Sequence, residues 1–292
     1  MQNFFKSSLI DVKQLKEMID YHDVKNLRIL DCTLPFDKGS FLYKRQRIPN
    51  ALFFDVAGLR DTSSNYTMTF PKPENFRPFL EHLNISKKNF IICYDQYGIF
   101  SSPRAWFIFK AYDFPNVCVL NGGFPKWLGS GYEIENKQLD DLNLDRNLDK
   151  IYDEENAKEL ETEDLKLNSN ILVDLKYVME ARKKKIDKSV LLDTRHPMKY
   201  EYGNIPNSIN IPYTSFINPD HTFKTKEEIK EVFEEKGYCD VDSKEFISYC
   251  TIGLTACIGY LALNSVVGNE NVKLYDGSYE EFSDNVNNSL YI

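Results

Sequence analysis

The stretch SYCTIGLTAC (residues 248–257) decides how the rest of the chain is interpreted. Residues 245–249 just before Cys250 are predicted to form a short buried strand, and residues 256–263 the first turns of a packed helix. Cys250 therefore follows the end of a strand, and a helix begins six residues later. Gly253 allows the loop backbone angles that a side chain would forbid, and Thr255 suits the N-cap of the helix.

A loop of this kind can direct several backbone N–H groups toward one point, where the helix N-terminus adds a partial positive charge. A thiol at that point is expected to ionise more readily, and the thiolate is the nucleophilic form. We therefore expect Cys250 to be the nucleophile of an active-site loop that also contains Thr251, Ile252, Gly253, Leu254 and Thr255. The alternative is a structural cysteine, because cysteine is often buried as a small apolar residue.

Four sequence landmarks occur twice in the same order, about 155 to 162 residues apart. The first copies are residues 28–31, 48–54, 91–95 and 117–122, and the second copies are residues 190–193, 205–211, 246–250 and 272–277. A repeat of this length is a duplicated domain and not a solenoid period. Asp95 stands in the first copy where Cys250 stands in the second, so only the second copy has a thiol at this position.

Strands and helices alternate in each copy, which predicts an α/β fold with a parallel sheet covered by helices on both faces. Ligands of such sheets bind at the carboxyl ends of the strands, where both Asp95 and Cys250 are expected. We assign residues 1–140 to the first domain and 166–292 to the second. The acidic stretch 141–165 between them is interpreted as an interdomain connection.

Composition limits the partners and the compartment. The chain has 292 residues and a net charge of −8, which disfavours nucleic acid as a partner because phosphate binding calls for a basic surface. The six cysteines are widely spaced, so a reducing compartment is favoured. No apolar run has the length of a membrane span, and the first residues resemble neither a signal peptide nor a transit peptide. We expect a cytoplasmic protein, with a mitochondrial location as the less favoured alternative.

The repeated landmarks resemble those of the tandem rhodanese family, which includes the thiosulfate and 3-mercaptopyruvate sulfurtransferases. In the first copy the resemblance rests on RIPNALFFD (47–55), SSPRAW (101–106) and GGFPKW (122–127). In the second copy it rests on DTR (193–195), GNIP (203–206), the loop 250–257 and YDGS (275–278). The family's active loop begins with the catalytic cysteine and ends Gly-Val-Thr-Ala-Cys, close to the loop found here. The resemblance implies two tandem rhodanese-like domains, the first of them inactive.

The chemistry that the resemblance implies is a sulfur transfer in two steps. The Cys250 thiolate takes the outer sulfur of a donor and becomes a persulfide, and a thiol or cyanide then removes that sulfur. Arg195 matches the arginine that holds the anionic donor, since a guanidinium can bind a carboxylate or sulfonate through two hydrogen bonds. Its alternative is a surface or interdomain ion pair. Asp55 matches a supporting aspartate, the acceptor is a thiol such as thioredoxin or glutathione, and neither a cofactor nor a metal is expected.

The chain departs from both branches of the family next to the nucleophile. Thiosulfate-type enzymes carry basic residues after the cysteine, and mercaptopyruvate-type enzymes carry Gly-Ser, whereas Thr251 and Ile252 stand here. Met68 aligns with a histidine of the mercaptopyruvate type. The segment 200–205 is shorter than in that type, and a second donor-binding arginine has no match. Donor preference between thiosulfate and 3-mercaptopyruvate is therefore left open.

The nucleophile loop is also found in proteins with two other functions. The first is a catalytically weak double rhodanese that acts as a persulfide carrier or a protein-interaction module, which the changes at Ile252 and Met68 favour. The second is a cysteine phosphatase, whose nucleophile also lies in a strand-to-helix loop. That chemistry needs an arginine closing the loop around the phosphate, and residues 253–256 contain none.

Overall fold

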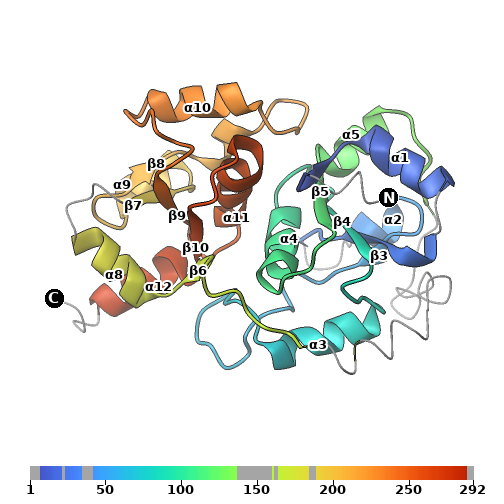
Figure 1. The fold of residues 1–292 in the computed structure, drawn as a ribbon, viewed down its shortest axis with the longest axis horizontal. Coiled ribbons are helices and arrows are strands. Elements are labelled where there is room, and N and C mark those ends of the chain that lie inside the picture. The colour runs from blue at the N-terminus through green and yellow to red at the C-terminus, as the bar shows by residue number, and fades with distance from the viewer. Residues whose placement is uncertain are drawn as a thin grey trace. The chain divides into compact units, whose positions relative to one another are not determined.

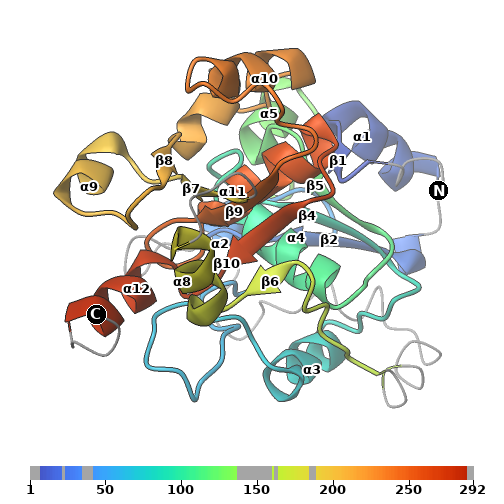
Figure 2. The ribbon, with the colours of Figure 1, turned by 60° about the vertical axis from the view of Figure 1, so that its left-hand side comes forward.

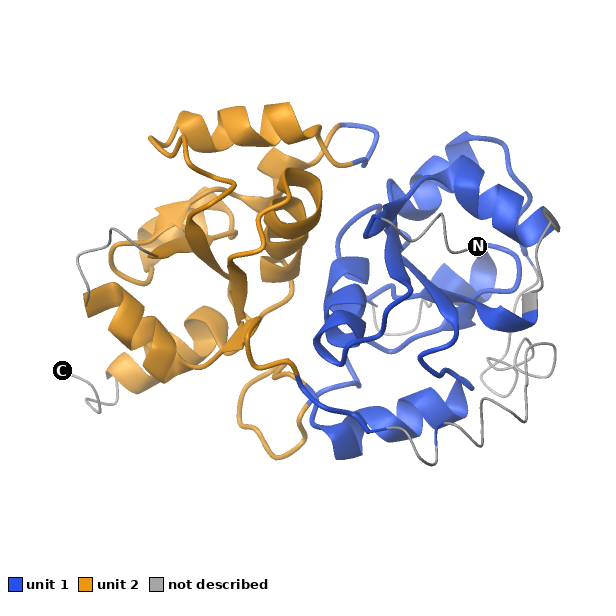
Figure 3. Cartoon of the chain, in the orientation of Figure 1, with its two compact units in different colours: residues 1–60, 71–167, 219–222 blue, residues 61–70, 168–218, 223–292 orange. Residues whose placement is uncertain are grey.

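The computed structural model describes residues 7–21, 24–34, 42–136, 160, 164–183 and 189–287 (Figure 1). These residues form two compact units (Figure 3). Unit 1 comprises Met1–Arg60, Pro71–Leu167 and Pro219–Thr222, and unit 2 comprises Asp61–Phe70, Asn168–Asn218 and Phe223–Ile292. Most of the acidic connection 141–165 lies outside the described residues, so the domain boundaries expected there stay a prediction.

Unit 1 is a five-stranded sheet in the order β1-β5-β4-β2-β3, with every pair parallel. Its strands are β1 (Leu9–Ile10), β2 (Leu27–Asp31), β3 (Leu52–Phe53), β4 (Phe90–Tyr94) and β5 (Val117–Leu120). Its helices are α1 (Val12–Tyr21), η2 (Val24–Asn26), α2 (Leu42–Arg45), α3 (Pro73–His82), α4 (Ser102–Ala111) and α5 (Gly123–Gly129).

Unit 2 repeats this topology with the strand order β6-β10-β9-β7-β8, again with every pair parallel. Its strands are β6 (Leu172–Val173), β7 (Ser189–Asp193), β8 (Ile209–Asn210), β9 (Glu245–Tyr249) and β10 (Val272–Tyr275). Its helices are α8 (Leu175–Lys183), α9 (Pro197–Tyr202), η3 (Tyr213–Phe216), α10 (Lys226–Glu234), α11 (Ala256–Leu261), the π-helix η4 (Ala262–Val267) and α12 (Ser278–Asn287). The predicted α/β fold with two parallel sheets is confirmed.

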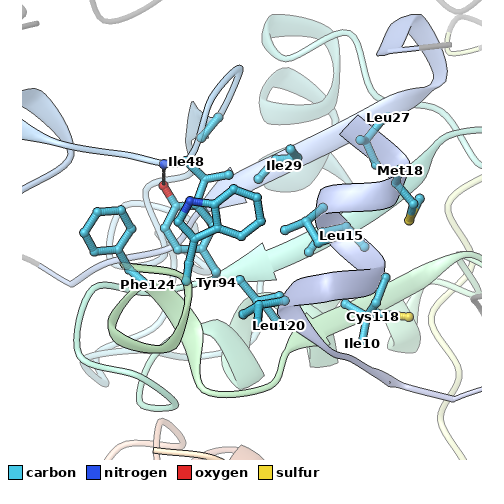
Figure 4. Packing of buried hydrophobic residues seen from close by; sticks show 14 of the residues in the cluster. Ile10, Leu15, Met18, Leu27, Ile29, Ile48, Tyr94, Cys118, Leu120 and Phe124 are labelled. Atoms are coloured by element: carbon cyan, nitrogen blue, oxygen red, sulfur yellow. Dashed lines mark hydrogen bonds between the residues drawn. The ribbon is translucent and has the colours of Figure 1, made fainter. Parts of the chain in front are cut away.

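The central strands explain why both sheets are covered on two faces. Every residue of β2 is buried, as are four of the five residues of β4 and of β9. Successive side chains of a strand point to opposite faces, so such strands need helices on both sides. In unit 1, Ile92 and Tyr94 of β4 pack with residues of α1 and α5 in one hydrophobic cluster (Figure 4).

The core of unit 2 is built in the same way. On one face, residues of α8 and α12 pack against β7, β9 and β10, and the two helices lie side by side in Figures 1 and 2. Elsewhere, Phe233 of α10 lies between Phe216 and Phe246, with ring centroids 5.9 and 5.1 Å away. All six residues of α11 are buried, as expected for a helix that is apolar on every side.

The edge strands β1 and β6 were not foreseen. The apolar spacing of residues 7–22 and 172–184 predicts one helix in each stretch, whereas Leu9–Ile10 and Leu172–Val173 pair with β5 and β10 before the helices begin. Two residues are too few to show a strand period, and their apolar side chains also fit the helical spacing that follows. His22 and Lys184, at the ends of these predicted helices, lie outside the described residues.

One tyrosine hydroxyl anchors the same turn in each unit. Tyr94 Oη accepts a hydrogen bond from the Ile48 amide at 3.3 Å (Figure 4), and Tyr249 Oη accepts one from the Ile205 amide at 3.2 Å. Tyr249 Oη also donates to Ser208 Oγ at 2.8 Å. Burial raises the pKa of both tyrosines, so both hydroxyls stay protonated at neutral pH.

Replacing either tyrosine with phenylalanine is expected to lower the free energy of unfolding by roughly 1 to 3 kcal/mol, because a buried amide loses its acceptor. Urea unfolding of Tyr94→Phe and Tyr249→Phe measures this loss. Losses of similar size are expected, since the Tyr94 hydroxyl also bonds the Asp31 carboxylate and the Tyr249 hydroxyl also bonds Ser208. Equal stability of both variants and the unsubstituted chain would contradict the prediction.

No helix within the described residues combines the length and the apolar character that crossing a membrane requires.

Candidate active site

Cys250 directly follows β9, the central strand of unit 2. Its side chain is buried, with 2% of the residue exposed. The loop after it turns at Gly253, whose φ of 83° lies in the region that favours glycine, and α11 begins at Ala256. The structure therefore brings the five predicted loop residues 251–255 together between the strand and the helix.

Thr255 occupies the N-cap position of α11 but does not cap the helix with its side chain. Its hydroxyl instead lies 3.2 Å from that of Thr194, which also donates to the Tyr249 carbonyl at 3.2 Å. Within the described part of the chain, the backbone N–H groups of Ile252, Thr255 and Ala256 donate to no protein acceptor. These donors are available to an anion at the loop.

A second segment holds the nucleophile in place. Ser278 Oγ accepts the amide hydrogen of Cys250 at 3.2 Å and donates to the Tyr275 carbonyl at 2.9 Å. The amides of Tyr279 and Glu280 donate to the carbonyls of Cys250 and Thr251, both at 3.0 Å. The stretch YDGS (275–278) is part of the resemblance to the family, but its role in holding the nucleophile was not predicted. A serine with a positive φ of 53° could not be recognised from the sequence.

Arg195 is buried beside the loop-bearing strand and forms an ion pair with Asp193. Its Nε lies 3.0 Å from both Asp193 carboxylate oxygens, and its Nη2 lies 2.6 Å from Oδ2 of Asp193 and 2.7 Å from the carbonyl of Gly203. The guanidinium carbon also lies 4.2 Å from the centre of the Tyr279 ring. Burial lowers the pKa of Arg195, but the hydrogen bonds and charge of Asp193 outweigh it and the pKa is raised.

This arrangement leaves one nitrogen of the guanidinium available. Among the described residues, Arg195 Nη1 makes no hydrogen bond, and it is not enclosed by protein. Its two N–H groups can therefore bind an anion that comes from solvent. The ion pair with Asp193 does not use up the donors that a substrate would need.

Unit 1 shows what such a loop binds. Its loop 95–101 is one residue longer than the loop 250–255, and Gly98, three residues after Asp95 as Gly253 is after Cys250, has a φ of 106°. Asp95 Oδ2 accepts hydrogen bonds from the amides of Phe100, Ser101 and Ser102 at 2.9 to 3.0 Å and from the Ser102 hydroxyl at 2.7 Å. Ser101 and Thr255 are the N-cap residues of the two helices, so the counterparts of Ser101 and Ser102 in unit 2 are Thr255 and Ala256. The N–H groups of the loop thus form an anion-binding cradle. A carboxylate fills this cradle in unit 1, and the corresponding cradle beside Cys250 in unit 2 is open.

The arginine is also missing from unit 1. Asp31 pairs in register with Tyr94 as Asp193 does with Tyr249, so Thr33 takes the position of Arg195. The Asp31 carboxylate accepts hydrogen bonds from Thr33 and from Gln96 Nε2, and no cation replaces the guanidinium in these contacts. Burial raises the pKa of Asp31 to about 6, although these hydrogen bonds oppose the shift.

This raised pKa makes stability depend on pH. Between the ordinary value of 3.8 and about 6, the folded chain binds more protons at Asp31 than the unfolded chain does. Its contribution is therefore fully present below pH 3.8 and is lost as pH rises through 6, by roughly 3 kcal/mol in total. Urea unfolding between pH 4 and 7 should show a smaller fall for Asp31→Asn than for the unsubstituted chain. Parallel curves would exclude Asp31 as the source.

Asp55 and Met68 are two further positions singled out from the sequence. Asp55 belongs to unit 1, where its carboxylate accepts hydrogen bonds from the amides of Ala57 and Gly58 at 3.1 and 2.9 Å. Its supporting role stays a prediction. Met68 lies in the loop 61–70 of unit 2 and is buried. A thioether therefore stands at the position aligned with the family histidine. Among the described residues, no group of three or more His, Cys, Asp or Glu side chains is arranged to hold a metal ion.

Comparison with known proteins agrees with the geometry. Residues 11–130 and 177–285 each match the rhodanese-like domain family. The chain belongs to the rhodanese family of sulfurtransferases. Thiosulfate sulfurtransferase of Rattus norvegicus is 30% identical over 296 residues, covering 94% of this chain and 91% of the relative. The 3-mercaptopyruvate sulfurtransferase of Mus musculus is 31% identical over 250 residues, covering 82% and 78%.

A solved structure shares the rhodanese architecture of both units. The 3-mercaptopyruvate sulfurtransferase SseA from Escherichia coli superposes with a TM-score of 0.76 at 25% identity, covering 94% of this chain and 99% of that one. The resemblance inferred from the sequence is therefore confirmed for the family and the fold. Because relatives of both donor types match this rhodanese at similar identity, they do not decide its donor.

Proposed function

We propose that this rhodanese transfers a sulfane sulfur from 3-mercaptopyruvate or thiosulfate to a thiol or cyanide through a persulfide on Cys250. One observation carries the proposal: Cys250 stands where Asp95 stands in unit 1, and there the loop N–H groups bind an anion. A thiolate and a terminal persulfide sulfur are anions as well. The same kind of loop can therefore stabilise the nucleophile before the transfer and the persulfide after it.

The first half-reaction forms one S–S bond and breaks one bond in the donor. With thiosulfate, the Cys250 thiolate attacks the outer sulfur, and sulfite leaves with the electron pair of the old S–S bond. With 3-mercaptopyruvate, the C–S bond breaks instead, and the enolate of pyruvate leaves and takes up a proton. In both reactions the negative charge stays on the terminal sulfur of Cys250, next to the N–H groups of Thr255 and Ala256.

The second half-reaction returns the thiolate. Cyanide or an acceptor thiolate attacks the outer sulfur, the S–S bond to Cys250 breaks, and thiocyanate or a new persulfide departs. No external oxidant or reductant is needed, because the sulfane sulfur passes on without a net change in electrons. The proposed cellular acceptor is a thiol such as thioredoxin or glutathione, and the proposed compartment is the cytoplasm, which keeps thiols reduced.

Arg195 is proposed to bind the anionic group of the donor through Nη1. Asp193 and the Gly203 carbonyl hold Nε and Nη2, so the guanidinium approaches the donor in one orientation. Binding through a pre-oriented charge loses less conformational entropy than binding through a free surface side chain. Ile252 contributes neither a hydroxyl nor a charge, which makes Arg195 the cation that the proposal assigns to the donor.

Intact-mass analysis tests the proposal. The protein is incubated separately with thiosulfate and with 3-mercaptopyruvate, freed of donor and weighed before and after addition of a thiol. We expect a gain of one sulfur atom that the thiol removes and that Cys250→Ser does not show. The donor giving the faster gain is the preferred one. Absence of any gain with both donors would contradict the proposal.

The second candidate is a persulfide carrier or an interaction module with little turnover. The buried Met68 in the loop 61–70 and the apolar Ile252 favour it, because neither can relay a proton to a leaving group. This function predicts that the persulfide, once formed, reacts slowly with small thiols and cyanide but passes to a specific protein. Rapid steady-state turnover with a small acceptor would exclude it.

A further inference from the structure

We propose that Thr67 and Glu280 are positioning residues of the site in unit 2. The loop 61–70 belongs to this unit although it lies far from the rest of it in sequence (Figure 3). Through Glu280 it anchors the segment 278–280, and this segment sets the places of Cys250 and Arg195. The inference rests on the proposed function, because it concerns the nucleophile and the donor-binding arginine of that reaction.

The segment 278–280 holds the nucleophile through three successive residues. The Ser278 hydroxyl binds the amide of Cys250, and the amides of Tyr279 and Glu280 bind the carbonyls of Cys250 and Thr251. All three hydrogen bonds reach the backbone on either side of the thiol. A shift of the segment would therefore move Cys250 and the start of its loop together.

The same segment holds the arginine. The ring of Tyr279 stacks on the Arg195 guanidinium at 4.2 Å, a distance typical of a cation–π contact. The Tyr279 hydroxyl lies against Gly203, the residue that follows α9. A Cβ built at Gly203 would lie only 2.2 Å from Tyr279 Oη. Tyr279 thus links the backbone at Cys250 with the side chain that is proposed to bind the donor.

Glu280 connects this segment to the loop 61–70. Its Oε2 accepts the Thr67 amide at 2.8 Å, and its Oε1 accepts the Thr67 hydroxyl at 2.6 Å, so both carboxylate oxygens are used. The Phe70 amide of the same loop donates in the same way to Asp276 Oδ2. Together these bonds hold residues 276 and 280 on either side of Ser278 and Tyr279.

The anchoring matters because Ser278 has a positive φ of 53°, a conformation that residues other than glycine rarely adopt. Such a conformation persists only where surrounding contacts hold it. The bonds from the loop 61–70 supply contacts on the side away from the nucleophile. Without them the start of α12 can relax, and the hydroxyl of Ser278 then leaves the Cys250 amide.

The experiment compares Glu280→Ala, Glu280→Gln and Thr67→Val with the unsubstituted protein. Two rates are measured by mass spectrometry: formation of the Cys250 persulfide in a single turnover, and alkylation of Cys250 by iodoacetamide. Asp284→Asn is the matched control, because Asp284 lies on the same helix four residues beyond Glu280 and accepts a hydrogen bond from Tyr66 of the same loop at 3.5 Å. Thermal unfolding is recorded for every variant.

We expect Glu280→Ala to slow persulfide formation roughly 3- to 10-fold, as loss of a charge-assisted pair at a partly exposed position implies. Glu280→Gln and Thr67→Val should lose less, since each keeps part of the contact, and combining these two should cost less than the product of their separate effects. Cys250 alkylation should change in the same order, while the unfolding midpoint stays within a few degrees.

Rates equal to those of the unsubstituted protein in Glu280→Ala would overturn the inference. Equal losses in Asp284→Asn would overturn it too, because they would show a general effect of loop docking. If Glu280→Ala does not fold, the rates of Glu280→Gln and Thr67→Val still test the inference. If the unsubstituted protein forms no persulfide, the proposed function fails, whereas the alkylation rates still test the positioning by themselves.

Discussion

Replacing Cys250 with serine will abolish sulfur transfer, with a loss of at least roughly 10⁴-fold in turnover, because a serine hydroxyl is not ionised at neutral pH and cannot carry the sulfane sulfur. The fold should survive. Serine differs from cysteine by one atom, and the hydrogen bonds at this position involve the backbone amide and carbonyl of residue 250. Thiocyanate formation from each donor and cyanide measures the loss.

The matched control for this variant is Cys257→Ser. Cys257 is also buried in unit 2, and its thiol contacts the Gly253 carbonyl at 3.3 Å, a bond that a serine hydroxyl can replace. This variant should keep most of the activity. It would then show that the loss in Cys250→Ser does not arise from replacing just any buried cysteine of unit 2. Transfer undiminished in Cys250→Ser would rule out the persulfide mechanism at this residue.

The second large effect is expected at Arg195. Changing it to lysine keeps a positive charge that can still approach Asp193, but it removes the planar guanidinium and its free Nη1. A charge-assisted hydrogen bond contributes about 1.5 to 3 kcal/mol, so kcat/KM for an anionic donor should fall roughly 10- to 100-fold. The loss should lie mainly in the first half-reaction. Stopped-flow or quenched measurement of persulfide formation separates it from the transfer to the acceptor.

Arg182→Lys is the matched control for this substitution. Arg182 also belongs to unit 2 and lies over an aromatic ring, with its guanidinium carbon 5.9 Å from the centre of the Phe282 ring. It makes none of the contacts described around Cys250, so its replacement should leave kcat/KM within twofold. If Arg195→Lys affects only the second half-reaction, the arginine serves the acceptor and not the donor.

The sequence allowed the duplicated fold to be predicted because the central strands carry a strong and repeated signal. Residues 91–94 and 246–249 are largely apolar, end in tyrosine and are followed by a loop with glycine at its fourth position, so one copy could be aligned on the other. The edge strands β1 and β6 escaped detection, since they have two residues each and acquire their form by pairing with β5 and β10. Pairing between distant residues leaves no local period.

The candidate site was likewise predicted only in part. Cys250 and the residues after it could be named because a strand, a glycine and a helix occur in one continuous stretch. The contribution of Ser278, Tyr279 and Glu280 could not be named, because it depends on a non-glycine residue with positive φ and on a loop more than 200 residues away. The ion pair of Arg195 with Asp193 was not predicted, although the two residues lie only two positions apart in the sequence.

The filled loop of unit 1 has a consequence for how this rhodanese responds to free anions. The Asp95 carboxylate is tied covalently to its own cradle, so its effective concentration there far exceeds that of any dissolved anion. Sulfite, thiosulfate or phosphate therefore cannot compete for that loop at ordinary concentrations. Despite its two homologous halves, the chain should titrate with one loop site per molecule and without cooperativity between the copies.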